Sequence, residues 1–147
     1  MTTEILTTTP DSEIVSTRIF NFTVEIVFQA WSDPGYLKQW WGRAGFTNTF
    51  HIFEFKVGGI WKFTMHGPDK GHYENECEFI KIESPLLIAW QRHSNPIFQV
   101  VVHFERIDSE STKVVFKMLF ATTEECNKLR KFVVDKICRC RVDDEAG

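Results

Sequence analysis

The stretch TFHIFEFKVGGIWKFTMH, residues 49–66, decides the fold of this chain. On both sides of Gly58-Gly59, apolar and polar residues alternate, which is the period of a β-strand with one buried face. Two glycines between alternating runs are typical of a tight hairpin, because the primed turns that join hairpin strands need positive φ. The stretch therefore predicts two antiparallel strands, at 49–56 and 60–66.

The same period continues after the hairpin. Alternating runs bounded by turn residues recur at intervals of roughly 8 to 12 residues, as they do in antiparallel sheets. Short connections between such runs favour a meander, in which each strand pairs with the next one along the chain. Four more strands are expected, at 73–82, 86–93, 97–106 and 112–120.

One strand and two short helices are expected before the hairpin. The segment EIVSTRIFNF (13–22) alternates as a strand does, and the apolar residues within 24–31 recur at helical spacing. The sequence SDP at 32–34 is typical of a helix start, because proline lacks the backbone N–H that would be unpaired there. This second helix is expected to end at Gly42.

A long helix is expected at the C-terminal end. Thr122 and Glu125 have the spacing of a capping box, and apolar residues from Cys126 to Cys140 line one side of the helix that follows. A curved antiparallel sheet with one apolar face needs a cover, and this helix is the longest available. The prediction is an α+β, helix-grip fold: a curved antiparallel sheet of six to seven strands wrapped around the long C-terminal helix, with the two short helices closing its open end.

Length and composition predict a single domain. The chain has 147 residues, of which 43% are hydrophobic and 14% aromatic, and this is ample material for one core. Residues 1–12 are expected to form a flexible N-terminus, residues 13–141 the helix-grip domain, and residues 142–147 a frayed tail.

Charge and cysteine content narrow the expected partners. The formal net charge of −3 gives no basic field, so no nucleic-acid partner is expected. No apolar stretch reaches the roughly 20 residues of a membrane span. The four cysteines form no CxxC pair, and three of them lie near the C-terminus, which favours reduced thiols and a cytoplasmic location.

Basic residues crowd the expected last helix. Six lysines and arginines lie between residues 128 and 141, against one acid, Asp135. They could contact an anionic membrane or an acidic partner. Alternatively, they form a solvated face whose charge complements the dipole at the C-terminal end of the helix.

Four motifs carry a family resemblance. AWSDP, QWWG, VGGIWKF and MHGPDK occur in this order between residues 30 and 70. With them, residues 13–136 resemble the activator of heat-shock protein 90 ATPase-like family, of the START/Bet v-like (SRPBCC) superfamily. The resemblance implies the helix-grip fold. The eukaryotic co-chaperone of that family has a second, N-terminal domain that does much of the chaperone binding, and this chain resembles only the C-terminal type of domain.

Three functions are open as alternatives. The first is binding of a small hydrophobic or aromatic ligand in a cavity between the sheet and the last helix. The second, implied by the family name, is a chaperone-associated role, with a chaperone or a second copy of the chain as partner. The third, implied by the superfamily, is a cyclase- or hydrolase-like enzyme. It would need two or more polar residues of suitable pKa in the cavity, and Tyr73, Asn75 and Arg92 are too few to name a reaction.

Alternation assigns a surplus of aromatic residues to the inner face of the sheet. Ligand sites are mostly apolar with a few placed polar groups, although a plain packed core would use the same residues. Asn75 on that face would be a buried amide, paired either by a backbone group or by the ligand. The predicted cavity residues are Trp41, Phe53, Phe55, Trp61, Phe63, Met65, Tyr73, Asn75, Cys77, Phe98, Val100, Phe116, Met118 and Phe132. No catalytic residue and no cofactor is predicted.

No metal site is predicted either. The five histidines show no ligand spacing, although His66 and His72 bracket a hairpin loop and could approach each other. Cys138 and Cys140 are two residues apart on a helix and so face apart, which argues against metal or redox chemistry.

Trp40 and Trp41 cannot both face one core, because adjacent helical residues point roughly 100° apart. Leu37 and Trp40 are expected to pack inward with Trp31. Trp41 is then expected at the cavity mouth, either as a gate for the ligand or as a plug that completes the core.

Overall fold

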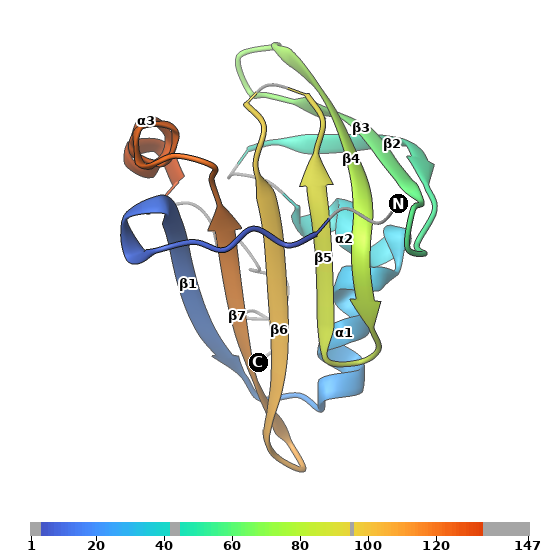
Figure 1. The fold of residues 1–147 in the computed structure, drawn as a ribbon. Coiled ribbons are helices and arrows are strands. Elements are labelled where there is room, and N and C mark those ends of the chain that lie inside the picture. Colours follow the sequence, from blue (N-terminus) through green and yellow to red (C-terminus); the bar gives the residue numbers. More distant parts are fainter. Residues whose placement is uncertain (1–3, 42–44, 95, 134–147) are drawn as a thin grey trace.

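The structure, a computed structural model, describes residues 4–41, 45–94 and 96–133, and of residues 130–133 it describes the backbone alone. Within these ranges seven strands and three α-helices follow one another in the order that the sequence predicts, and one short 3-10 helix (η1), which was not predicted, precedes the first strand (Figure 1). The elements are η1 (Pro10–Ser12), β1 (Glu13–Phe20), α1 (Val24–Ser32), α2 (Pro34–Trp40), β2 (Thr47–Phe53), β3 (Ile60–His66), β4 (His72–Glu83), β5 (Leu87–Arg92), β6 (Gln99–Asp108), β7 (Ser111–Leu119) and α3 (Thr123–Val133).

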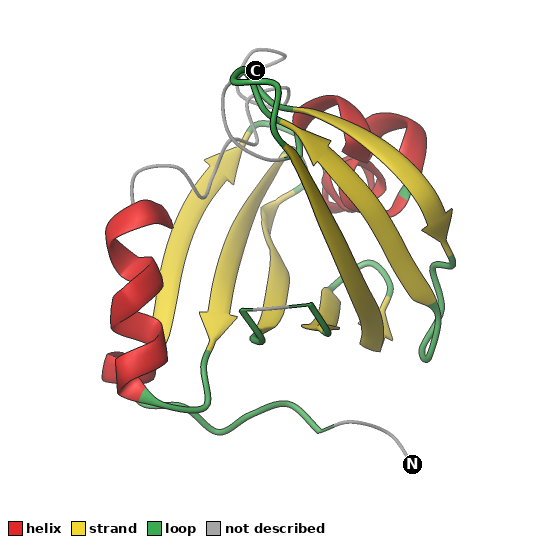
Figure 2. Cartoon of the chain, turned by 90° about the horizontal axis from the view of Figure 1, so that it is seen from above, coloured by secondary structure: helices red, strands yellow, loops and turns green. Residues whose placement is uncertain are grey.

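All seven strands form one antiparallel sheet, in the order β1-β7-β6-β5-β4-β3-β2. Strands β2 to β7 are the predicted meander, and β1 returns to pair with β7, from Glu13 opposite Leu119 to Phe20 opposite Thr112. The sheet is curved, with α1 and α2 on one side and the N-terminal segment on the other (Figure 2). The α+β class and the predicted number of strands are confirmed.

Helices α1 and α2 cover one face of the sheet, which we call the inner face. Thr23 caps α1, because its hydroxyl oxygen accepts a hydrogen bond from the backbone N–H of Ile26 at 3.3 Å. The buried side of α1, which ends in Trp31, packs on β6 and β7. Asp33 caps α2 in the same way, so two local capping contacts determine where both helices begin.

The last helix, α3, begins as predicted. Thr122 Oγ1 accepts a hydrogen bond from the backbone N–H of Glu125 at 3.1 Å. The described part of α3 contacts η1 and β1, at one edge of the sheet (Figure 2). Its predicted extension to residue 141, with Cys138 and Cys140, lies outside the described residues. Within the described ranges, none of the helices has the length and apolar character of a membrane crossing.

A second apolar cluster lies on the outer face of the sheet, opposite α1 and α2, and sequence analysis did not predict it. Its buried members are Ile80, Leu87, Ala89, Val101 and Leu119, and Ile5 packs against them. The continuous apolar runs LLIA (86–89) and VVV (100–102) are typical of strands that are buried on both faces. A prediction based only on the alternation of apolar and polar residues does not use these runs, and so it misses the outer cluster.

Gln99 attaches the N-terminal segment to this outer face. Its side chain is 2% exposed. The Oε1 atom accepts a hydrogen bond from the backbone N–H of Leu6 at 2.7 Å, and Nε2 donates to the backbone oxygen of Glu4 at 2.8 Å. Residues 4–9 consequently cross the sheet on its outer side (Figure 1). The flexibility suggested for residues 1–12 stays a prediction.

The reversal between β2 and β3 differs in detail from the predicted two-residue turn. Gly58 has a φ of +85°, as a glycine in a turn permits. The closing hydrogen bond runs from the backbone N–H of Gly59 to the oxygen of Lys56, at 2.8 Å, so Val57 and Gly58 are the central residues. Gly59 has a different role: a Cβ built on it would lie 2.0 Å from the backbone oxygen of Glu54. Only a hydrogen atom fits there.

Gly59→Ala is expected to destabilise the fold more than Gly58→Ala. The methyl group at position 59 would force the backbone at Glu54 to move, whereas at position 58 it meets nothing within 4 Å and costs about 1–2 kcal/mol for the left-handed backbone. The free energy of unfolding of both variants, measured in urea, tests the order. Equal losses would show that the close approach to Glu54 does not constrain the hairpin.

Candidate functional site

Trp61 lies at the centre of the aromatic residues on the inner face. It is 1% exposed, which confirms its predicted burial. Its ring centroid lies 4.6 Å from that of Phe63, 5.2 Å from Trp41 and 5.3 Å from Trp90. Aromatic pairs at such separations contribute about 0.5–1.5 kcal/mol each beyond the burial of their area. The inner face is therefore a continuous aromatic cluster centred on β3.

Trp40 and Trp41 have different surroundings, as helix geometry predicts. Trp40 is 6% exposed, its ring lies 4.6 Å from that of Trp31, and its indole N–H donates to a backbone oxygen of α1 at 3.1 Å. Trp41 is half-buried, and its ring lies 5.2 Å from Trp61 and 5.8 Å from Trp90. Trp41 thus connects the end of α2 to the aromatic cluster, and its role as gate or plug stays a prediction.

The structure brings most of the predicted cavity residues together. Buried on the inner face are Trp61, Phe63, Asn75, Cys77, Val100, Phe116 and Met118. Partly buried against the same cluster are Trp41, Phe53, Phe55, Met65 and Phe98. Tyr73 lies apart from them, because it is 47% exposed and its hydroxyl donates to Asp69 Oδ2 at 3.1 Å. The side chain of Phe132 lies outside the described residues.

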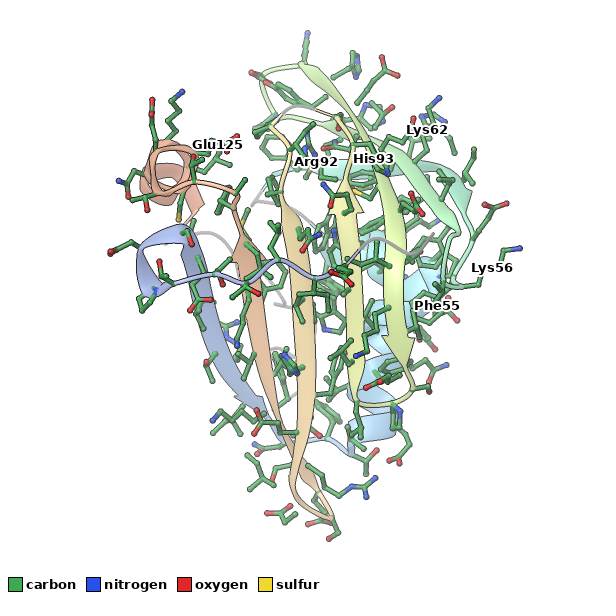
Figure 3. The ribbon with its side chains drawn as sticks, in the orientation of Figure 1. Phe55, Lys56, Lys62, Arg92, His93 and Glu125 are labelled. Atoms are coloured by element: carbon green, nitrogen blue, oxygen red, sulfur yellow. The ribbon has the colours of Figure 1, made fainter. Side chains whose placement is uncertain are left out.

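Asn75, Cys77 and Arg92 form a polar group beside the aromatic cluster. Arg92 lies at the end of β5 (Figure 3), and Asn75 and Cys77 lie on the neighbouring strand β4. Arg92 Nη1 donates to Asn75 Oδ1, and Asn75 Nδ2 donates to the backbone oxygen of Tyr73 at 3.0 Å. The Arg92 guanidinium also lies 5.7 Å from the centroid of the Phe98 ring, within the range of a cation–π contact. The buried amide of Asn75 is therefore paired by a backbone group and by a charged side chain.

The Cys77 thiol is held in its protonated form. Burial raises the pKa of Cys77 to about 12, and the opposing effect of the nearby Arg92 charge is smaller. A protonated thiol is a poor nucleophile. The polar group can therefore hold a ligand by charge and hydrogen bonds, but Cys77 does not supply a ready nucleophile.

Two indole N–H groups inside the aromatic cluster lack an acceptor. Trp31 Nε1 and Trp61 Nε1 are buried, and neither has a hydrogen-bond partner among the described residues. Buried indole N–H groups ordinarily have one, and a buried donor left unpaired costs about 1–3 kcal/mol. A bound molecule with acceptor atoms would remove that cost.

The predicted cavity between the sheet and the last helix stays a prediction, because the side chains of 130–133 and all residues after 133 lie outside the described part of the chain. Two hollows formed by described residues lie elsewhere. A hollow of about 520 Å³ lies between residues 21–26 and 108–111, and one of about 580 Å³ lies on α3. Neither is lined by the aromatic cluster.

His66 and His72 do approach each other. Their Nδ1 atoms lie 2.8 Å apart, and His66 Nε2 lies 2.7 Å from Thr49 Oγ1. These contacts join β2, β3 and β4. Among the residues that the structure describes, no three histidine, cysteine, aspartate or glutamate side chains are grouped to hold a metal ion.

Sequence analysis missed Trp31 and Trp90 as members of the site, and it did not predict the pairing of Arg92 with Asn75. A signal for two of these residues was present. In LLIAWQRH (86–93) a period of two places Trp90 and Arg92 on the same face. Sequence analysis did count Arg92 among the polar residues of the cavity, but it named no partner for it.

Comparison with known proteins defines the class. The seven-stranded sheet, the two short helices after β1 and the C-terminal helix are shared with solved helix-grip structures. Residues 21–137 match the family described as activator of Hsp90 ATPase homolog 1-like protein, and the chain belongs to this family. No match was found among curated protein sequences.

Three solved structures illustrate the likeness. A protein of Nitrosomonas europaea has a TM-score of 0.83 and 14% identity, over 92% of this chain and 93% of that chain. An AHSA1 protein of Silicibacter pomeroyi has a TM-score of 0.72 and 17% identity, over 92% and 97%. An AHSA1-like protein of Aeromonas hydrophila has a TM-score of 0.74 and 18% identity, over 91% and 92%. At these identities the likeness shows the fold alone.

Trp61→Ala is expected to lower the free energy of unfolding by about 3–5 kcal/mol, through lost burial and the cavity left behind. Tyr36→Ala is the control, because Tyr36 is 51% exposed on α2, and its loss is expected to stay within about 1 kcal/mol. Chemical denaturation of both variants gives the comparison. A Trp61 variant as stable as the parent protein would contradict the central position of this residue.

Proposed function

We propose that this protein binds a small hydrophobic or aromatic molecule against the inner face of its sheet. The observation that carries the proposal is the pair of buried indole N–H groups, on Trp31 and Trp61, that have no acceptor within the described part of the chain. Ligand sites combine mostly apolar walls with a few polar groups that orient the ligand. An aromatic molecule with acceptor atoms would pack against the rings and pair with these donors.

The chemistry beside the cluster favours binding over a reaction. A cyclase- or hydrolase-like enzyme needs a positioned acid, base or nucleophile. Burial keeps the Cys77 thiol protonated, and Asn75 is engaged with Arg92 and the backbone. These groups are suited to orienting a ligand.

The family description favours a second candidate, a chaperone-associated role, because it names activation of the Hsp90 ATPase. The partner would be a chaperone or a second copy of this chain, and the expected location is the cytoplasm. We rank this role second because the aromatic cluster that characterises this chain is buried. A protein partner docking on the outside would not reach it.

Trp41→Ala is expected to weaken binding of the neutral fluorescent probe N-phenyl-1-naphthylamine more than Trp40→Ala does. A half-buried ring can cover a ligand while contributing less to the core. Trp40→Ala is expected to lower the melting temperature more, because Trp40 is 6% exposed and packs on Trp31. Probe titrations rank the two variants by affinity, and thermal melts rank them by stability.

The role of Trp41 as a gate is supported if Trp41→Ala weakens probe binding more while Trp40→Ala lowers the melting temperature more. If the two variants lose the same stability and keep the same probe affinity, Trp41 is a plug. If the parent protein binds neither this probe nor the anionic probe 1-anilinonaphthalene-8-sulfonate, the proposed function is wrong.

Addition of this protein to a heat-shock protein 90 chaperone is expected to leave the ATPase rate unchanged, because the proposed site faces inward. The measurement is steady-state ATP hydrolysis by the chaperone at increasing concentrations of this protein, with a heat-unfolded sample as control. A saturable stimulation would reverse the ranking of the two candidates.

A further inference from the structure

Arg92 lies in the same row of the inner face as Trp61. Trp61 is opposite Cys77 in the β3–β4 pairing, and Cys77 is opposite Arg92 in the β4–β5 pairing. Neighbouring strands are about 4.8 Å apart, so the backbones of Trp61 and Arg92 lie roughly 10 Å apart, with the small Cys77 side chain between them. This separation suits a molecule with an apolar ring system at one end and a polar group at the other.

Strand alternation and two contacts direct the Arg92 guanidinium to this face. Its Nη1 donates to Asn75 Oδ1, and it lies 5.7 Å from the Phe98 ring centroid. The next residue, His93, faces the other side of the sheet, where its Nε2 lies 3.0 Å from Glu78 Oε1 (Figure 3). The guanidinium is therefore held in a defined position beside the aromatic cluster.

The charge at this position is positive. Burial lowers the pKa of Arg92, but a guanidinium stays protonated in proteins at neutral pH. The facing Cys77 thiol is protonated as well, because burial raises its pKa to about 12, so it contributes no negative charge. A planar guanidinium matches a carboxylate with two parallel hydrogen bonds, so this position favours an anionic group on the ligand.

We propose that the ligand is an amphiphilic anion, a small aromatic or acyl carboxylate whose carboxylate binds Arg92 while its apolar part lies along Trp61 and Phe63. This inference rests on the proposed function and narrows it to a chemical class. The carboxylate accepts hydrogen bonds from the guanidinium, and an acceptor atom near the ring end of the ligand pairs with the N–H of Trp61.

Two fluorescent probes with the same ring system separate charge from ring packing. 1-Anilinonaphthalene-8-sulfonate carries an anionic group in place of the carboxylate, and N-phenyl-1-naphthylamine is neutral. The parent protein is expected to bind the anionic probe at least about tenfold more tightly, because a hydrogen bond to a charged group is the stronger kind. Arg92→Gln is expected to abolish this preference and to leave the affinity for the neutral probe within about twofold.

Arg106→Gln is the matched control. Arg106 is also a strand arginine, but it is exposed and paired with Glu25 at 2.8 Å on the surface, so its loss is expected to change neither affinity. If Arg92→Gln keeps the preference, or if the control variant loses it equally, Arg92 does not bind the anionic group and the inference is wrong. The proposed binding function would stand in that case, whereas failure of both probes to bind the parent protein would overturn both.

Arg92→Gln removes the donor to Asn75 Oδ1, which can impair folding of the variant. A competition experiment on the parent protein tests the inference without this variant. 1-Naphthoate and the neutral 1-naphthamide are each used to displace the bound anionic probe. The naphthoate is expected to act at a concentration at least about tenfold lower. Equal potency of the two competitors would overturn the assignment of an anionic ligand.

Discussion

The packing of Trp31 on the sheet is the contact on which the rest of this structure depends. Its ring centroid lies 6.4, 6.1 and 5.9 Å from those of Trp90, Phe104 and Phe116, on β5, β6 and β7. It also lies 4.6 Å from Trp40 on α2, so one side chain joins both short helices to three strands. A seven-residue helix such as α2 is too short to be stable by its own hydrogen bonds. The position of Trp41 over the sheet therefore depends on this packing.

The same packing accounts for the chemistry of the candidate site. Aromatic rings around Trp31 and Trp61 exclude water. The indole N–H groups of these two tryptophans therefore contact no solvent, and they have no acceptor among the residues that the structure describes. Unpaired buried donors oppose folding, and natural proteins keep such local conflicts mainly where function requires them. Arg92 adds a charge at the margin of the same surface. Apolar walls, unpaired donors and one oriented cation together favour a ligand that has both an apolar and a polar end.

The sequence predicted those features that depend on local patterns. Alternation over 60–66 places Trp61 and Phe63 on the buried face, and Thr122 with Glu125 marks the start of α3. Contacts that depend on how two strands are aligned with each other could not be predicted from local patterns. The contact between Arg92 and Asn75 follows from the β4–β5 register, which a single sequence does not specify. Tyr73 is exposed because it lies near the start of β4. Alternation assigns its side chain to the inner face, but it does not say how far along the strand other residues cover that face.

The outer face shows a further limit. The pairing of β4 with β5 shifts between Phe79 and Lys81, and such a bulge interrupts the alternation of faces. Ile80 follows the inward-facing Phe79 and lies in the outer cluster, as alternation places it, whereas the bulge brings Ile82 against the inner cluster. An unbroken period of two would have placed both isoleucines on one face. Alternation alone therefore assigns Ile82 to the wrong face, because the sequence does not show where the bulge lies.

The N–H resonances of the five tryptophan indoles test most directly whether the aromatic inner face binds a ligand. Nitrogen-15-labelled protein is titrated with 1-anilinonaphthalene-8-sulfonate, and the resonances are assigned by single tryptophan-to-phenylalanine substitutions. The indole N–H signals of Trp31 and Trp61, which lack a described acceptor, are expected to shift with saturation. The signal of Trp40, whose N–H already donates to Ala30, is expected to shift least. Unchanged Trp31 and Trp61 signals at saturating probe, or a larger shift at Trp40, would contradict binding at this face.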